Sequence, residues 1–323
     1  MIQDQGTVGQ DTTHAVQQAV GDAAHGAAAD TAAHGFDLGE IILHHTADAW
    51  TIELHPFDAL PLHTIHLPRF ADVHLFGLTF NLSPTKHVFF MLLVAALVFF
   101  VMWLTGWMLK RQRAGEQAPH GFAAAMEAFV LWVRNDIAIA NIGHGGAKFA
   151  PVIMTLFFFI LFSNVMGLMP PPFNVTPSGN LAVTAALAIM VFFIVEISGV
   201  VKLGPKGYLR TIFPSIPGMS GAGALVMSLA MAPIEVIGKL VKPFALAVRL
   251  FGNMTAGHFV ILSLLGIIFL FGALPYGANW GIGIITAALV TAIMMLELFV
   301  AFLQAYVFAL LTAVFIGLMQ HEH

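Results

Sequence analysis

The stretch Glu235–His258, EVIGKLVKPFALAVRLFGNMTAGH, places charged and polar residues inside a long apolar run. Charges within a membrane segment are costly, and such residues usually line an ion path or a polar cavity. On a helix with about 100° per residue, a polar stripe about 80° wide holds Glu235, Lys239, Lys242, Arg249 and Asn253. His258 lies on nearly the opposite side from Arg249. The stretch therefore predicts a membrane helix that presents an arginine to one neighbour and a histidine to another.

The amino-acid composition is typical of a membrane protein. The chain is 59% hydrophobic and 9% charged, whereas soluble domains are about 45–50% apolar and about 25% charged. Its mean hydropathy is +0.87. With no cysteine and a net charge of −4, the sequence offers neither a thiolate metal site nor a basis for nucleic-acid binding. It also lacks the G-x-x-x-x-G-K-[ST] phosphate loop. We expect an all-α polytopic membrane protein that holds no cofactor.

Residues 1–84 form a predicted N-terminal extension, which precedes a membrane domain at residues 85–323. Residues 1–35, rich in Ala, Gly, His and Asp, favour disorder or a weak helix. The alternating runs at residues 50–54 and 73–80 favour short β-strands. His63 and His66 have a spacing that a metal site could use, but no paired acid or cysteine pattern accompanies them. A solvated surface is the preferred interpretation, and no metal is expected.

Three apolar runs are long enough to cross a hydrocarbon core of about 30 Å. They are Val88–Leu109, Lys148–Met169 and Asn180–Val201. Between the first two, Gly121–Ile139 has its apolar residues on one face, which favours an amphipathic helix in the plane of the membrane. Lys and Arg are rare before residue 88 and frequent at residues 110–113 and 202–210. The positive-inside rule therefore predicts an outer N-terminus and an inner C-terminus.

The last two predicted helices are unusually long. Ile234–Phe269 and Ile282–Met319 each have about 36 residues, or about 54 Å at 1.5 Å per residue. A strong tilt would fit that length into a core of about 30 Å, and a break in each helix is the alternative. Together with the three runs described above, these helices bring the prediction to about five membrane-crossing helices.

The two long helices are predicted to form a hairpin, whose turn lies near residue 277. Counting outward from that turn puts His258 level with Glu297, because both lie about 20 residues from it. The same count puts Gln304 level with Arg249. The hairpin therefore predicts two polar meeting points between the helices, one at each level.

Four stretches resemble one known family. The stretches Leu246–His258 (LAVRLFGNMTAGH) and Leu303–Phe315 (LQAYVFALLTAVF) resemble subunit a of the F-type ATP synthase. Residues 159–170 and the sequence Pro177-Ser178-Gly179-Asn180 are similar to the middle helices of the same family. The resemblance covers roughly residues 85–320, and residues 1–84 match nothing in it.

The resemblance implies a non-catalytic, proton-translocating stator subunit. Such a subunit provides two offset half-channels to buried carboxylates on a rotating c ring. It also implies the subunit b peripheral stalk, the remaining ATP synthase subunits and the lipid bilayer as partners, and the bacterial inner (plasma) membrane as the location. The N-terminus is then periplasmic and the C-terminus cytoplasmic. The family's essential arginine falls on Arg249, its asparagine on Asn253 and its glutamine on Gln304.

Other candidate residues fall on two sides of Arg249. The enteric-bacterial pattern has Glu where His258 stands and His where Glu297 stands, so this sequence exchanges the pair. Candidates for the outer path are His258, Glu297, Asn164, Ser178 and Asn180. Candidates for the inner path are Glu235, Glu196 and Lys239, with Glu235 and Lys239 spaced as an i, i+4 pair.

Several alternatives remain open for these residues and for the chain. A buried hydrogen bond could explain His258 and Glu297, helix packing could explain the polar residues of the middle helices, and snorkelling could explain the lysines. A self-contained secondary transporter is a rival function, although the chain shows no internal repeat. A purely structural membrane scaffold would leave Arg249 unexplained.

Overall fold

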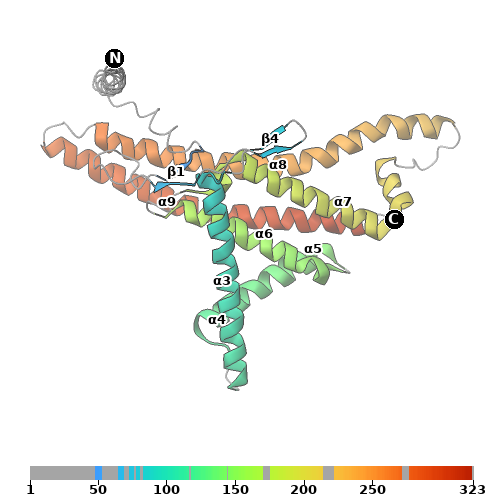
Figure 1. Cartoon of the computed structure of the whole chain (residues 1–323), viewed down its shortest axis with the longest axis horizontal. Helices are drawn as coiled ribbons and strands as arrows, with labels where there is room; N and C mark the ends of the chain where they lie inside the picture. Colours follow the sequence, from blue (N-terminus) through green and yellow to red (C-terminus); the bar gives the residue numbers. More distant parts are fainter. Residues whose placement is uncertain are drawn as a thin grey trace, which may run out of the picture.

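The computed structural model describes most of the membrane domain and short pieces of the extension (Figure 1). The described ranges are 48–52, 65–68, 73–75, 78–80, 83–115, 118–143, 145–169, 175–213, 222–270 and 276–321. The predictions for residues 1–35 and His63 lie outside the described residues. The hairpin turn was predicted near residue 277, which lies in α9, because that helix begins at Tyr276. Within them the chain is helical apart from four short strands, as the predicted fold class requires.

The described part of the extension contains two small antiparallel ladders. Strand β1 (Thr51–Ile52) pairs with β2 (Ile65–His66), and β3 (Val73–Leu75) pairs with β4 (Leu78–Phe80). Strands β1, β3 and β4 lie in the two alternating runs, whereas β2 lies between the runs and was not predicted. Two backbone hydrogen bonds, from Leu67 to the Trp50 carbonyl and from Lys86 to the Ala49 carbonyl, are each 2.9 Å long. The first extends the contact between the two strands, and the second joins the extension to the start of the first membrane helix.

Five helices are long and apolar enough to cross a membrane. They are α3 (Lys86–Ala114), α6 (Gly146–Gly167), α7 (Leu181–Ile212), α8 (Ala222–Leu270) and α9 (Tyr276–His321). Figure 1 shows α6, α7, α8 and α9 side by side, with α3 standing across them. This arrangement confirms the predicted polytopic all-α architecture.

The predicted amphipathic helix between α3 and α6 is present but is not uniform. It consists of α4 (Gly121–Trp132), a π-helix η1 (Val133–Ile139) and the short α5 (Ala140–Ile142). Val133 and Ile137 are fully buried, whereas Asp136 is exposed, so the two-faced pattern is real. Stacked rings join Trp132 to Phe302 and Tyr306 of α9. The buried face of this segment therefore packs on the helices that carry the candidate residues.

Helix α7 continues beyond its predicted end. The prediction ended it near Lys202, and the chain does break there, because Gly204 has φ 70° and ψ 166°. A positive φ suits glycine, which has no Cβ to clash. A further helical turn then runs to Ile212. It folds Tyr208 and Thr211 back towards Glu196.

Helices α8 and α9 are longer than predicted. The sequence analysis began α8 at Ile234, just after Pro233, but the helix begins at Ala222 and continues through both Pro233 and Pro243. Figure 1 shows that α8 is curved along this part, in agreement with the hydrogen bonds that prolines remove. The 49 residues of α8 and 46 of α9 span about 74 and about 69 Å. Their crosswise direction relative to α3 is what strong tilting of the hairpin requires.

The main core lies where η1, α6 and α9 meet. Its largest fully buried side chains include Phe157, Phe158 and Phe308. Near the end of α9, a Cβ on Gly317 would overlap the backbone oxygen of Asn141. This close approach seats the end of α9 on α5, and so fixes the level of the polar residues further along α9.

Candidate functional site

An acid and an imidazole meet between the two long helices. His258 Nδ1 of α8 and Glu297 Oε1 of α9 are hydrogen-bonded at 3.2 Å, with the Glu297 side chain buried and the His258 side chain 13% exposed. The hairpin register predicted this closeness, and the structure confirms it. Two glycines make room for the pair: a Cβ on Gly257 would overlap the Glu297 carboxylate, and one on Gly167 would lie 3.0 Å from Cε1 of His258.

The second polar atom of each partner is buried without a protein partner in the described residues. These atoms are Nε2 of His258 and Oε2 of Glu297. Ser163 Oγ and Gln304 Nε2 are likewise buried with no hydrogen-bond partner among the described residues. Buried polar groups are normally hydrogen-bonded, by protein or by ordered water. These groups can therefore bind water or exchange protons without breaking an existing protein contact.

A hydrogen-bonded cluster lies beside the pair, between α6 and the 3₁₀ turn η2 (Pro177–Gly179). Ser178 donates to Asn164 Oδ1 at 2.6 Å, and Asn164 donates to the Ala301 carbonyl of α9 at 3.3 Å. Thr176 bonds to Ser178 at 2.9 Å and to the Ser163 carbonyl at 3.0 Å. The predicted residues Asn164 and Ser178 thus share one cluster. Thr176 was missed, because a lone threonine carries no sequence signal.

Asn180, the remaining outer candidate, lies in a different set of contacts. Its Oδ1 accepts from the Ala182 amide at 2.8 Å and so caps α7, while its Nδ2 donates to Asp48 Oδ2 at 3.2 Å. The other oxygen of Asp48 shares a hydrogen bond of 2.8 Å with His87 Nδ1. Sequence reasoning missed Asp48 and His87, which lie 39 residues apart.

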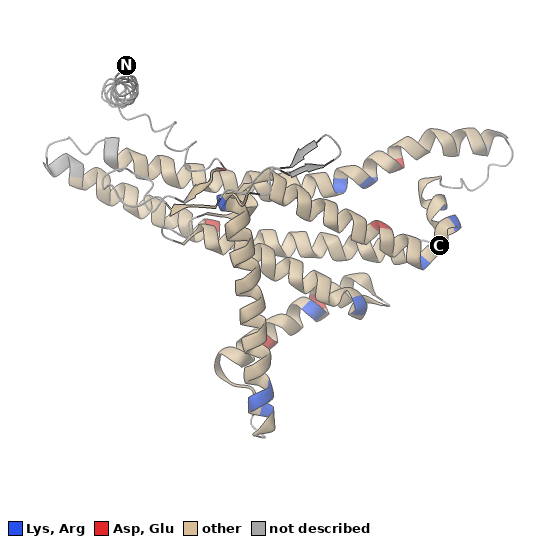
Figure 2. Cartoon of the chain, viewed as in Figure 1, with Lys and Arg blue, Asp and Glu red and all other residues tan. Residues whose placement is uncertain are grey.

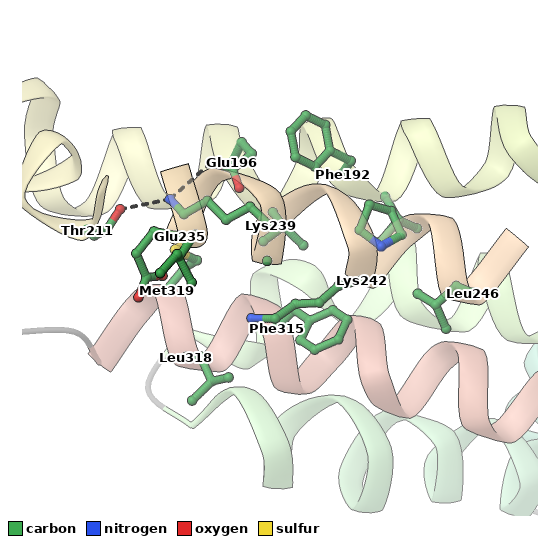
Figure 3. A pocket seen from close by; sticks show the side chains of 15 residues that line it. Phe192, Glu196, Thr211, Glu235, Lys239, Lys242, Leu246, Phe315, Leu318 and Met319 are labelled. Atoms are coloured by element: carbon green, nitrogen blue, oxygen red, sulfur yellow. Dashed lines mark hydrogen bonds and ion pairs between the residues drawn. The ribbon is translucent and has the colours of Figure 1, made fainter. Parts of the chain in front are cut away.

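The inner candidates line a cavity of about 330 Å³ between α7, α8 and α9 (Figure 3). Lys239 lies 3.6 Å from Glu196 Oε2, donates to Thr211 Oγ1 at 2.8 Å and sits 4.5 Å from the centre of the Tyr208 ring. The Tyr208 hydroxyl donates to the same Glu196 oxygen. Glu235 lines the cavity as well. Lys239, spaced i, i+4 from Glu235, makes its printed contacts with residues of α7, Glu196 and Thr211.

Arg249 points away from the bundle. Its side chain is exposed, and it makes no hydrogen bond or ion pair with any described residue. Asn253 follows one turn later and is half-buried. Gln304 is buried, with 5% of its surface exposed, and no hydrogen bond joins it to Arg249 within the described ranges. Gln304 and Arg249 therefore lie at the same level of the hairpin but do not meet, because one side chain is buried and the other is exposed.

Arg249 separates the two polar groups along α8. Lys239 precedes it by ten residues and His258 follows by nine, which at 1.5 Å per residue is about 15 Å and about 14 Å. The nearby stretches of α8 and α9 also expose apolar side chains, among them Phe244, Val248, Leu296, Phe299 and Leu303. An isolated guanidinium on such a surface needs an anionic or aqueous neighbour.

Replacing one member of the Lys239–Glu196 pair tests whether the contacts in the cavity are coupled. Lys239→Met should lower the free energy of unfolding by about 1–3 kcal/mol, because it leaves the Glu196 carboxylate without its cation. The double change Lys239→Met with Glu196→Gln should cost less than the single change. Thermal unfolding of the protein in detergent measures both. Lys242→Met, at an exposed lysine on the same cavity, is the control. Equal losses in the single and double variants would contradict the coupling.

The sequence also matches characterised families and proteins. A family model described as ATP synthase A chain matches residues 88–317. ATP synthase subunit a of Chloroherpeton thalassium is 41% identical over 281 residues, covering 87% of this chain and 77% of the relative. ATP synthase subunit a of Anaeromyxobacter dehalogenans is 40% identical over 309 residues, covering 94% and 76%. The matched region holds all five long apolar helices almost entirely. This multi-pass membrane chain therefore belongs to the ATP synthase subunit a family.

Proposed function

We propose that the chain is the proton-translocating stator subunit of an F-type ATP synthase and couples proton flow to rotation of a c ring. The observation that carries the proposal is the order of polar groups along α8. A polar cavity lies on one side of Arg249 and the buried His258–Glu297 pair on the other. Two polar regions that do not join suit two offset half-channels, each open to one side of the membrane.

In this proposal Arg249 controls the charge of the c-ring carboxylate. A guanidinium remains protonated at any physiological pH, so it attracts a carboxylate and favours its ionised form. A protonated carboxyl that reaches Arg249 gives up its proton to the inner side. The fixed positive charge also opposes direct passage of protons between the two regions. Asn253 and Gln304 flank this point with neutral polar groups, which can orient a carboxylate without competing for its proton.

The outer half-channel is assigned to His258, Glu297 and the adjacent cluster. Histidine exchanges protons near neutral pH, and an acid partner at 3.2 Å can receive or return the proton. The unpartnered Nε2 of His258 and Oε2 of Glu297 suit exchange with water. Asn164, Ser178 and, through Asp48, Asn180 supply fixed polar atoms on the same side. A proton taken up there passes to the c-ring carboxylate.

The inner half-channel is assigned to the cavity of about 330 Å³. Its polar lining includes Glu196, Glu235 and Lys239, from two different helices. A proton released at Arg249 would leave through this space, which is wide enough for water. Glu196 is the acceptor within it that the Tyr208 hydroxyl and Lys239 hold in place.

The proposed partners follow from the surfaces that α8 and α9 leave open. The apolar side chains around Arg249 suit packing against the apolar helices of a carboxylate-bearing c ring. Subunit b, the other synthase subunits and lipid complete the surroundings. Because the sequence has no phosphate loop, we assign nucleotide chemistry to other chains and regard this subunit as non-catalytic by itself.

We further propose that residues 1–84 are an extension on the periplasmic side of the bacterial inner membrane, with residues 85–323 as the membrane domain. Figure 2 shows Lys and Arg at the lower end of α3, around α4 and α5, at the end of α7 and partway along α8, with fewer beside the upper end of α3. The sequence has no Lys or Arg after Arg249, so the turn of the hairpin carries no positive charge from these residues. Cytoplasmic ends are enriched in these residues. The C-terminus is then cytoplasmic.

Removing the charge of Arg249 should stop the coupling of proton flow to ATP synthesis without lowering the amount of assembled protein. Arg249→Ala is expected to reduce proton-driven ATP synthesis in inverted vesicles to background, with subunit levels unchanged. Arg249→Lys should also fail, since an ammonium lacks the planar fork of donors. Arg113→Gln, which removes an exposed cation at the end of α3, is the control. Near-normal synthesis in Arg249→Ala would refute the role.

The His258–Glu297 pair should behave as one unit. His258→Ala and Glu297→Ala are each expected to slow passive proton flux through the stripped membrane sector markedly, because each leaves its partner unpaired. The double exchange His258→Glu with Glu297→His should recover much of the flux, since it restores one acid and one imidazole. A double exchange no better than the worse single variant would show that the two do not work as a pair.

Orientation can be tested by labelling, because the chain has no cysteine of its own. A cysteine introduced at Gly115 should react with an impermeant maleimide only from the cytoplasmic side. A cysteine at Ile65, half exposed at the other end of α3, should react from the periplasmic side. Labelling of position 115 from outside in intact cells would reverse the scheme.

A further inference from the structure

We propose that Asp48 and His87 form a second acid–imidazole pair, which delivers protons from the outer surface to His258 and Glu297. The inference rests on the proposed function and adds the entrance of the outer half-channel to it. His87 Nδ1 and Asp48 Oδ1 share a hydrogen bond of 2.8 Å, in which either atom can hold the proton according to the ring tautomer, and Asn180 Nδ2 donates to Asp48 Oδ2 at 3.2 Å. One carboxylate thus joins the extension to the beginnings of α3 and α7.

The pair runs from the surface to the interior. The Asp48 side chain keeps 35% of its surface exposed, whereas the His87 side chain keeps only 6%. Asp48 can therefore take up a proton from bulk water, and His87 can carry it into a buried region. An imidazole suits this task, because it accepts a proton on one ring nitrogen while it releases one from the other.

The second pair lies close to the first. The turn η2 contacts α3, α6, α7 and α8, and so lies between them. Thr176, just before η2, and the His258 ring both meet the position of a Cβ on Gly167. Asn180, just after η2, binds Asp48. The turn therefore has Asp48 at one end and His258 at the other.

The backbone also anchors the extension to α3, because the Lys86 amide donates to the Ala49 carbonyl at 2.9 Å. The Asp48 carboxylate therefore adds a second contact at the same place. Its placement against a buried imidazole is the arrangement of a proton-transfer pair. The charged and titratable groups at this point are Asp48, His87, the adjacent Lys86 and, further in, His258 with Glu297.

The proposed transfer conserves protons at each step. In the His87 tautomer whose proton is on Nε2, a proton from outer water binds the Asp48 carboxylate and passes to the unprotonated Nδ1 of His87. The ring then releases its other proton from Nε2 to water. The unpartnered Nε2 of His258 accepts a proton from that water. No oxidant, reductant or bound cofactor is needed.

The test measures passive proton flux in membranes that carry the assembled complex. Asp48→Asn and His87→Gln should each lower the flux by about tenfold. This is less than the roughly 10²–10⁴-fold effect of a positioned proton-transfer group, because water can replace part of the relay. Glu127→Gln is the matched control, since it also neutralises a carboxylate paired with an α3 residue, Arg113 at 2.7 Å. Its flux should equal that of the parent.

A side-specific readout separates proton delivery from a structural role. Acidifying the outer side should restore flux in Asp48→Asn, because a higher proton concentration offsets slow uptake, and acidifying the inner side should not. Asp48→Glu, which keeps the acid, should retain most of the flux. Parent-like flux in both Asp48→Asn and His87→Gln, or loss of the assembled complex in both, would overturn the inference. If His258→Ala still blocks flux in the same membranes, the proposed function survives that result.

Discussion

A permanent positive charge on an apolar helix surface is the constraint on which this structure depends. Arg249 is exposed and, among the described residues, has no ion pair or hydrogen bond. Its neighbours on α8 and α9 include the exposed Phe244, Val248 and Phe299. Lipid cannot stabilise a guanidinium at that position. In the proposed function a partner surface supplies the carboxylate that this guanidinium needs, and the two polar regions lie on either side of Arg249 along α8.

Close helix packing holds the His258–Glu297 pair in place. Small residues allow membrane helices to approach one another, and here they also make space for functional side chains. The Glu297 carboxylate occupies the place that a Cβ on Gly257 would need, and the His258 ring and Thr176 lie where a Cβ on Gly167 would be. The pair is thus held by glycines on two different helices rather than by further hydrogen bonds. That arrangement leaves the second polar atom of each partner available.

The sequence predicted some contacts because simple geometry carried them. In a hairpin of two unbroken helices, residues equally far from the turn lie at one level, and this brought His258 to Glu297. Level alone did not bring Gln304 to Arg249, because one side chain points inward and the other outward. The i, i+4 spacing of Glu235 and Lys239 also did not indicate the observed partner of Lys239. Lys239 instead contacts Glu196 on another helix.

By itself the sequence determined the membrane class, the five long helices, the short strands of the extension and the family, because an apolar bilayer forces long apolar runs to be helical. Only the tertiary structure decided that α8 passes through Pro233 and that α7 turns back at Gly204. It also decided the contacts of His87 with Asp48 and of Tyr208 with Glu196. These contacts join residues on separate elements. Their distance and relative orientation depend on how whole helices pack, which no local pattern of residues encodes.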